Sequence, residues 1–315
     1  MMDPIIQLKG LTKCYGPQKA VDNLNLDIYK GEIFGLLGPN GAGKTTTILM
    51  MLGLTDPTDG SAFVCGHKAT SSPIAVKRKV GYMPDSLGFY DNMTALENLI
   101  YIARLNGLAE NDIRTRTSEL MEIVGLYSAM NKKTSTFSRG MKQRLGLAEV
   151  LVKRPDVIIL DEPTLGIDPS GVQEFLTLIK RLSEEQELTV LLSSHHLHHV
   201  QQVCDRVGIF VKGKLLAQGN IETLSADLFG NMGHVVSMKL AHDIPQPWPL
   251  QQYLEQWDAI KQITIDKKTI VFECKQNITP ALVRFFVENE YDILGVHQKD
   301  YGLDDIYQKY FEDIN

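Results

Sequence analysis

Residues 38 to 45 read Gly38-Pro39-Asn40-Gly41-Ala42-Gly43-Lys44-Thr45, which is the pattern G-x-x-x-x-G-K-[ST]. The run follows the predicted strand Glu32–Leu37 and opens the predicted helix Gly43–Leu52, the context that this pattern requires. Its glycines let backbone N–H groups curl around an anion, and the helix N-terminus adds partial positive charge. We expect a loop that binds a nucleoside triphosphate, with Lys44 on the β- and γ-phosphates and Thr45 on Mg²⁺. The alternative is a glycine-rich turn without a ligand.

A second apolar stretch, Val157–Leu160, ends in the two carboxylates Asp161 and Glu162. A continuous apolar run is typical of a strand that is buried on both faces of a parallel sheet. Ligands bind at the carboxyl ends of such strands. We expect Asp161 to hold Mg²⁺, directly or through water, and Glu162 to orient or deprotonate an attacking water. Adjacent carboxylates at a strand end can also be solvated side chains without a catalytic role.

Around these motifs, short β-rich runs alternate with helical stretches, which predicts an α/β domain with parallel strands. The predicted strands are Ile5–Tyr15, Ala20–Tyr29, Glu32–Leu37, Ser61–Cys65, Lys79–Met83, Val157–Leu160, Thr189–Leu192, Val207–Lys212 and Lys214–Ala217. The predicted helices are Gly43–Leu52, Thr94–Leu105, Ala109–Gly125, Ser138–Lys153, Pro169–Glu185 and His196–Cys204. Thr94 and Glu97 fit a capping box, and Ser138 is a good N-cap candidate.

The alternation pauses near Gly219–Phe229, which predicts a first domain at residues 1–220 and an accessory domain at residues 221–315. The second domain is expected to contain the strand His234–Ala241, the helix Leu250–Ile260, the strands Gln262–Asp266 and Thr269–Cys274, the helix Thr279–Glu290, the strand Ile293–Gln298 and the helix Leu303–Glu312. The order βαββαβ of its first six elements favours a small α+β domain of the ferredoxin-like type.

Composition limits the partners that this chain can have. The net charge is −6, and the last 95 residues carry 8 basic and 15 acidic side chains, so a nucleic acid is not expected as a partner. The four cysteines, Cys14, Cys65, Cys204 and Cys274, are far apart, as in proteins of a reducing cytosol. No signal-peptide pattern begins the sequence, and its apolar runs are shorter than the roughly 20 residues that cross a bilayer. We therefore expect a cytosolic chain that reaches a membrane only through another subunit.

Three further motifs carry a family resemblance. The run Ser138-Arg139-Gly140-Met141-Lys142-Gln143-Arg144 resembles the signature of ABC ATPases, L-S-G-G-Q or L-S-G-G-M-K-Q-R-L. The run Gly166-Ile167-Asp168-Pro169 resembles their D-loop, and Ser193-Ser194-His195 resembles their switch-histidine segment. With the two motifs above, the ordered set across Leu8–Gly219 is similar to the nucleotide-binding domain of an ABC transporter. The resemblance implies a P-loop NTPase fold with an antiparallel β subdomain and a helical subdomain.

The same resemblance implies roles for further residues. Tyr15 would stack on the adenine of ATP, although a lone aromatic at a strand end can also be structural. ATP would bind at Gly38–Thr46 of one copy, with Thr46 as the last loop residue, and would be closed in by Ser138 and Gly140 of a second copy. Asp168 would couple the two sites. His195 would contact the γ-phosphate, so that Glu162 and His195 are the expected catalytic pair of a MgATP-hydrolysing homodimer.

Two positions depart from the family pattern. Arg139 stands where the family has glycine, so its side chain must either point away from the nucleotide or add a positive contact to it. Asp85, which ends the run Gly81–Asp85, stands where the family has glutamine. Aspartate can still accept Mg²⁺ or a water proton, and the alternative is a surface aspartate in a turn. The cluster of His195, His196, His198 and His199 is interpreted as one switch histidine with three helix residues rather than as a metal site.

The signature and the C-terminal extension resemble ATPases that serve ABC-2-type transmembrane subunits, mostly exporters. The tail, residues 301–310, resembles the closing S-L-E-D-(V/L)-(F/Y) element of that group, and it is similar to the end of the ATPase subunit of the transporter that matures nitrous oxide reductase. The resemblance implies an ABC-2-type membrane partner, with this chain peripheral on the cytoplasmic face. Two other functions stay open: a soluble regulatory ABC protein and a nucleotide-binding module without catalysis.

Overall fold

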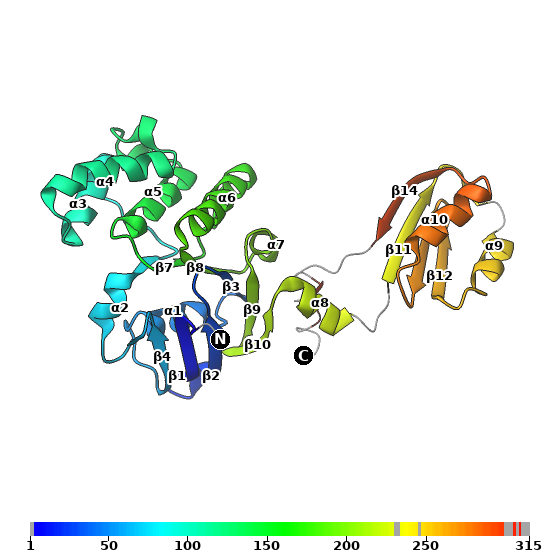
Figure 1. Ribbon diagram of the computed structural model, residues 1–315, viewed down its shortest axis with the longest axis horizontal. Helices are drawn as coiled ribbons and strands as arrows, with labels where there is room; N and C mark the ends of the chain where they lie inside the picture. The colour runs from blue at the N-terminus through cyan, green and yellow to red at the C-terminus, as the bar shows by residue number, and fades with distance from the viewer. Residues whose placement is uncertain (1–2, 230–233, 245–246, 299–304, 307–308, 310–315) are drawn as a thin grey trace. The chain divides into compact units, whose positions relative to one another are not determined.

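The strand that leads into the glycine-rich loop, β3 (Ile33–Leu37), lies inside a six-stranded sheet in the computed structural model (Figure 1). The strand order is β10-β9-β3-β8-β7-β6, with β6 (Val80–Met83), β7 (Val157–Asp161), β8 (Thr189–Ser194), β9 (Arg206–Val211) and β10 (Lys214–Gly219). Strand β10 is antiparallel to its neighbour, and the other five strands are parallel. The carboxyl ends of β3, β7 and β8 therefore meet at one edge, which brings the loop and the acidic pair together.

A second, antiparallel sheet of order β2-β1-β4-β5 contains β1 (Ile6–Tyr15), β2 (Gln18–Ile28), β4 (Asp59–Val64) and β5 (His67–Lys68). Helix α1 (Lys44–Met51) contributes Ile48 and Met51 to a core that also takes apolar side chains from both sheets. This shared core packs the start of α1, and with it the loop, against the two sheets.

The remaining helices of this part are α2 (Pro73–Lys79), α3 (Ala95–Leu105), α4 (Glu110–Ile123), α5 (Arg139–Leu151), α6 (Pro169–Gln186) and α7 (Leu197–Gln201), with single 3₁₀ turns at Tyr127–Ala129 and Thr134–Thr136. Helices α3, α4 and α5 pack against one another (Figure 1). The predicted capping box is confirmed, since Glu97 N donates to Thr94 Oγ1 at 3.1 Å and Thr94 N donates to Glu97 Oε2 at 2.7 Å. Ser138 caps α5 as predicted.

The structure describes residues 3–229, 234–244, 247–298, 305–306 and 309, and the chain forms two compact units, Met1–Ile221 and Glu222–Asn315. The second unit contains α8 (Ile221–Phe229), β11 (His234–Leu240), α9 (Pro247–Leu254), β12 (Ile260–Asp266), β13 (Thr269–Cys274), α10 (Thr279–Glu288) and β14 (Ile293–Gln298). Its four strands form an antiparallel sheet of order β12-β13-β11-β14 with a separate apolar core. Within the described residues, no helix is long and apolar enough to cross a membrane.

Some expected elements differ from those observed. The prediction that the alternation of strands and helices pauses at Gly219–Phe229 is wrong, because α8 occupies most of this segment. Ile221, Leu224 and Leu228 have the spacing of one helix face. Helix α9 begins before its expected start, because proline is tolerated in the first turn of a helix, and it ends before Ile260, which is buried in β12. The short elements α2 and β5 were not expected. The predicted helix Leu303–Glu312 lies largely outside the described residues.

Candidate active site

The glycine-rich loop connects β3 to α1 and depends on two glycines in the left-handed region. Gly41 has φ 80° and Gly43 has φ 107°, which L side chains rarely adopt. A Cβ atom on Gly43 would also lie 2.2 Å from the carbonyl oxygen of Ala20, closer than any real contact. Glycine is therefore required at this position for the chain to turn from the strand into the helix.

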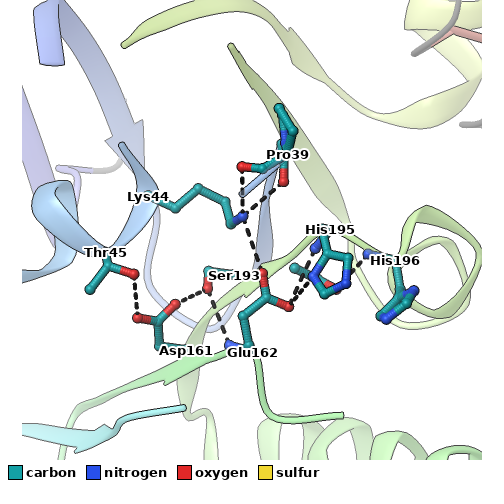
Figure 2. A network of polar contacts seen from close by, with 10 residues as sticks. Pro39, Lys44, Thr45, Asp161, Glu162, Ser193, His195 and His196 are labelled. Carbon is teal, nitrogen blue, oxygen red and sulfur yellow. Dashed lines mark hydrogen bonds and ion pairs between the residues drawn. The ribbon is translucent and has the colours of Figure 1, made fainter. Parts of the chain in front are cut away.

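Lys44, the first residue of α1, is almost fully buried, with 5% of its surface exposed. Its Nζ donates to the carbonyl oxygens of Gly38 at 2.8 Å and Pro39 at 3.3 Å, and it forms an ion pair with Glu162 Oε1 at 3.1 Å (Figure 2). An ammonium group has three N–H donors. Two of them have carbonyl acceptors, whereas Glu162 Oε1 is buried without a hydrogen-bond partner among the described residues, so its contact with Nζ is an ion pair and not a hydrogen bond.

Asp161 ends β7 and is buried, with 2% of its surface exposed. Its Oδ2 accepts from Thr45 Oγ1 at 2.8 Å, and its Oδ1 accepts from the hydroxyl of Ser193 on β8 (Figure 2). Within the part of the chain that the structure describes, no basic side chain forms an ion pair with Asp161. A buried carboxylate is costly without a counter-charge. Together with the Thr45 hydroxyl, this carboxylate has the oxygen-donor chemistry that Mg²⁺ prefers.

Glu162 follows directly and has φ 50°, an uncommon value for a residue other than glycine. Its backbone N donates to Ser193 O at 3.1 Å. Its Oε2 lies 2.8 Å from Nδ1 of His195 and also accepts from the His195 backbone N at 3.4 Å (Figure 2). Because an ionised carboxylate only accepts, Nδ1 carries the proton in this contact. His195 therefore holds Oε2 of Glu162 by hydrogen bonds, while Oε1 faces Lys44 in an ion pair and has no hydrogen-bond partner among the described residues.

A cavity of about 410 Å³ lies over the loop and is lined by residues 40–46, Asp161 and Glu162. Asp85, which is exposed, also lines this cavity, as the sequence predicts for a residue near the bound nucleotide. Two further lysines that sequence reasoning missed, Lys19 and Lys212, are part of the lining. Together with Lys44 they place three positive charges around a space that also contains carboxylates.

The other predicted residues do not line the cavity. Tyr15 ends β1 with 53% of its surface exposed, although it pairs with Gln18, which does line the cavity. Ser138 accepts from Met141 N at 3.3 Å as the N-cap of α5, and Gly140 lies in the first turn of that helix. Asp168 caps α6. The hydroxyl of Ser170 and the backbone N–H of Gly171 lower the pKa of Asp168.

Ser193 is a site residue to which the sequence gives no role of its own. Its carbonyl oxygen and hydroxyl contact both carboxylate residues, Asp161 and Glu162. Its position at the end of a predicted strand is visible in the sequence, but the pairing of β8 with β7 is not. The hypothesis of a histidine metal cluster is not tested, because the side chains of His198 and His199 lie outside the described part of the structure.

The site combines a parallel strand, a glycine loop with a buried lysine, and an acidic pair on a nearby strand. This combination defines the class of P-loop nucleoside triphosphatases. Comparisons with known proteins narrow this class. The family model described as "ABC transporter" matches residues 21–165. The chain is 38% identical to the bacitracin transport ATP-binding protein BcrA of Bacillus licheniformis, over 98% of this chain and 97% of that protein.

It is also 37% identical to the linearmycin resistance ATP-binding protein LnrL of Bacillus subtilis (strain 168), over 72% of this chain and 73% of that protein. Among solved structures, a dimeric ATP-binding cassette in a post-hydrolysis state with ADP and Pi matches with a TM-score of 0.62 and 26% identity, over 68% of this chain and 98% of that one. The chain belongs to the ATP-binding proteins of ABC transporters. It binds ATP and hydrolyses it to energise transport as part of a transporter complex, and the predicted ABC ATPase fold is confirmed.

Proposed function

We propose that this chain is the ATPase of an exporter, in which two copies hydrolyse MgATP for a separate ABC-2-type transmembrane subunit. The observation that carries the catalytic part of this proposal is the convergence of Lys44, Asp161 and Glu162 on one cavity of about 410 Å³ over the glycine-rich loop. Phosphoryl transfer needs positioning and neutralisation of charge. These side chains supply both functions in one place.

The loop residues Gly38–Thr46 would hold the phosphates through backbone N–H groups. Lys44 would exchange its ion pair with Glu162 for phosphate oxygens, which explains why a lysine is held at the cavity before nucleotide arrives. Thr45 and Asp161, with Asp85 across the cavity, would hold Mg²⁺. The ion would neutralise phosphate charge when bound.

Once Lys44 has been taken by phosphate, Glu162 Oε1 would be free to orient or deprotonate the attacking water. His195 would hold the other oxygen, since Nδ1 lies 2.8 Å from Glu162 Oε2. The charged hydrogen bond fixes the carboxylate, which is the kind of pre-organisation that catalysis uses. In this arrangement Glu162 is the catalytic carboxylate. His195 holds this carboxylate in place and contacts the γ-phosphate.

The signature residues Ser138 and Gly140, together with Asp168, would act on the nucleotide of a second, identical copy. Ser138 and Asp168 are exposed and Gly140 is half-buried, and none of the three lines the cavity of its own chain, which supports this arrangement. The similar cassette with ADP and Pi is itself dimeric. Tyr15, exposed beside the cavity, would stack on adenine.

Outward transport is supported by the printed name of one relative, a linearmycin resistance protein, and by the sequence features shared with exporters of the ABC-2 type. The chain would then lie on the cytoplasmic face of a membrane through its partner. The similarity of the tail to the nitrous oxide reductase maturation transporter stays a prediction, since residues 301–310 lie almost wholly outside the described residues.

For the chain's organisation we propose a nucleotide-binding domain at residues 1–220 and an accessory domain at residues 221–315. The βαββαβ order of β11 to β14 and the antiparallel strand order β12-β13-β11-β14 support a ferredoxin-like accessory domain. The bacitracin relative aligns over 98% of this chain, so the similarity extends into this second domain.

The proposed catalytic role is tested with Glu162→Gln in the full chain. We expect phosphate release to fall at least about a hundredfold, as losses of a catalytic group do, while MgATP still drives the formation of a dimer on size exclusion. Glu185→Gln, at an exposed position of α6, is the matched control. Turnover that survives in Glu162→Gln, or a variant that never dimerises with MgATP, would contradict the proposal.

A further inference from the structure

Arg139, the first residue of α5, follows directly after the cap residue Ser138. It is exposed, and within the described chain its guanidinium forms no hydrogen bond or ion pair. A side chain with five N–H donors and a permanent charge therefore stands at the start of the signature without a polar partner. Its position is set by a packing contact instead.

That contact is with Gly166, the first residue of the D-loop. A Cβ atom on Gly166 would lie 2.8 Å from Cδ and Nε of Arg139 and 3.0 Å from Cζ. The end of the arginine side chain therefore lies where a β-carbon on residue 166 would be, and a larger residue there would have to displace it. Gly166 also has φ 72°, so the backbone itself favours glycine at this position.

The loop that contains Gly166 begins at Glu162. Leu165 N donates to Glu162 O at 3.2 Å, and Ile167 N donates to Thr164 O at 3.3 Å, so the segment is a closed turn. Ile167 also lies beside the signature, because a Cβ atom placed on Gly140 would be 3.6 Å from its Cγ2, an ordinary van der Waals distance. The start of α5 therefore rests on the turn that follows Glu162.

We propose that Arg139 is a positioning residue that links the signature to the D-loop of the same chain, so that movement of the start of α5 is transmitted to Glu162. This inference rests on the roles proposed above for Glu162 and Ser138. Of the two possibilities open from the sequence, the contact favours a side chain that lies along its own D-loop over one that reaches a nucleotide. When the nucleotide of the facing copy binds the signature of this chain, the start of α5 moves. The position of the Glu162 carboxylate in the same chain then changes with it.

The first test compares variants of the full-length chain in steady-state phosphate release. Arg139→Ala removes the side chain from Gly166, whereas Arg139→Met keeps an unbranched stem and removes the charge. We expect Arg139→Ala to lower kcat about tenfold with little change in KM for ATP, because small displacements of a catalytic group are costly. Arg139→Met should retain most of kcat, and Lys180→Ala, at an exposed position of α6, controls for the lost surface charge.

A second test is a double-mutant cycle with Gly166→Ala, with thermal unfolding as the check that each variant folds. The methyl group introduced at residue 166 contacts the Arg139 side chain and also strains the backbone. The backbone strain is the same whether residue 139 is arginine or alanine. We expect Arg139→Ala to relieve part of the loss caused by Gly166→Ala, since residues in contact are not additive.

Normal kcat in Arg139→Ala, or strictly additive losses in the cycle, would overturn the link. Equal losses in Arg139→Ala and Arg139→Met, with an ATP-dependent dimer that weakens at high salt, would overturn it in favour of a charge contact with nucleotide. Failure of the proposed function would give a different result. ATP turnover would then persist in Glu162→Gln, whatever the effects of the Arg139 variants.

Discussion

Among single residues, Lys44 and Glu162 form the contact with the clearest functional consequence. Each is buried, and each is the other's ion-pair partner at 3.1 Å. Removing one partner of such a pair leaves an uncompensated charge, and binding a phosphate to Lys44 leaves Glu162 without its cation. In the proposed function the pair would therefore oppose nucleotide binding and, once broken, would leave Oε1 of Glu162 free for the water.

This competition predicts the effect of Glu162→Gln on nucleotide affinity. The amide cannot form the ion pair, so Lys44 is released at lower cost. Loss of a competing ion-pair interaction of roughly 1.4 kcal/mol corresponds to about tenfold tighter binding. Isothermal titration of MgADP into dilute protein measures this without turnover. Weaker binding in Glu162→Gln than in the parent would mean that Glu162 helps to hold the nucleotide rather than competing with it.

Among the elements, α5 combines the cap Ser138, the contact residue Arg139 and a partly buried acid, Glu149. Burial raises the pKa of Glu149 to about 8, and no basic partner offsets this effect. The folded state therefore holds a proton on Glu149 over a pH range in which the unfolded chain, with a glutamate pKa of about 4.3, has lost it. The contribution of Glu149 to the free energy of unfolding therefore falls as pH rises from about 4.3 to about 8.

Glu149→Gln removes this dependence. We expect the variant to be more stable than the parent by about 1–3 kcal/mol at pH 8.5 and nearly equal to it at pH 4.5, because the carboxyl of the parent is neutral in both states only at low pH. Denaturant unfolding at the two pH values gives the comparison, with Glu185→Gln as an exposed control. A difference that is the same at both pH values would show that packing, not ionisation, separates the variants.

In the whole molecule, each unit has its own apolar core. The large core of the first unit draws on residues 6–210, and the core of the second unit draws on residues 236–286. The cavity over the loop is lined by residues from 18 to 213. Among the described residues, none of those that line this cavity belongs to the second unit.

A chain that ends at Ile221 should fold and bind MgADP with the affinity of the full chain, within about twofold, because no lining residue is lost. Calorimetric titration and thermal unfolding of both chains measure this. A truncated chain that is insoluble, or that binds MgADP more than about tenfold more weakly, would show that the second unit is part of the first unit's fold.

Much of the fold follows from local patterns. The apolar runs Glu32–Leu37 and Val157–Leu160 predict buried strands, and the capping pair Thr94 and Glu97 predicts a helix start, because these signals act between neighbours in sequence. Helix α8 is not among the predicted helices, although its apolar residues have helical spacing. The predicted start of α9 is three residues too late, because Pro247 and Pro249 lie in the first turn.

The sequence alone established the glycine loop, the acidic pair and the ordered motifs of the family, since each is a run of adjacent residues whose chemistry is local. Tertiary structure set the order of the strands, the Lys44–Glu162 ion pair and the packing of Arg139 on Gly166. It also set the contacts of Ser193 with the Asp161 carboxylate and the Glu162 backbone N–H. The physical reason is that each of these contacts joins residues far apart in the chain, and only the packing of strands and helices brings them within contact distance.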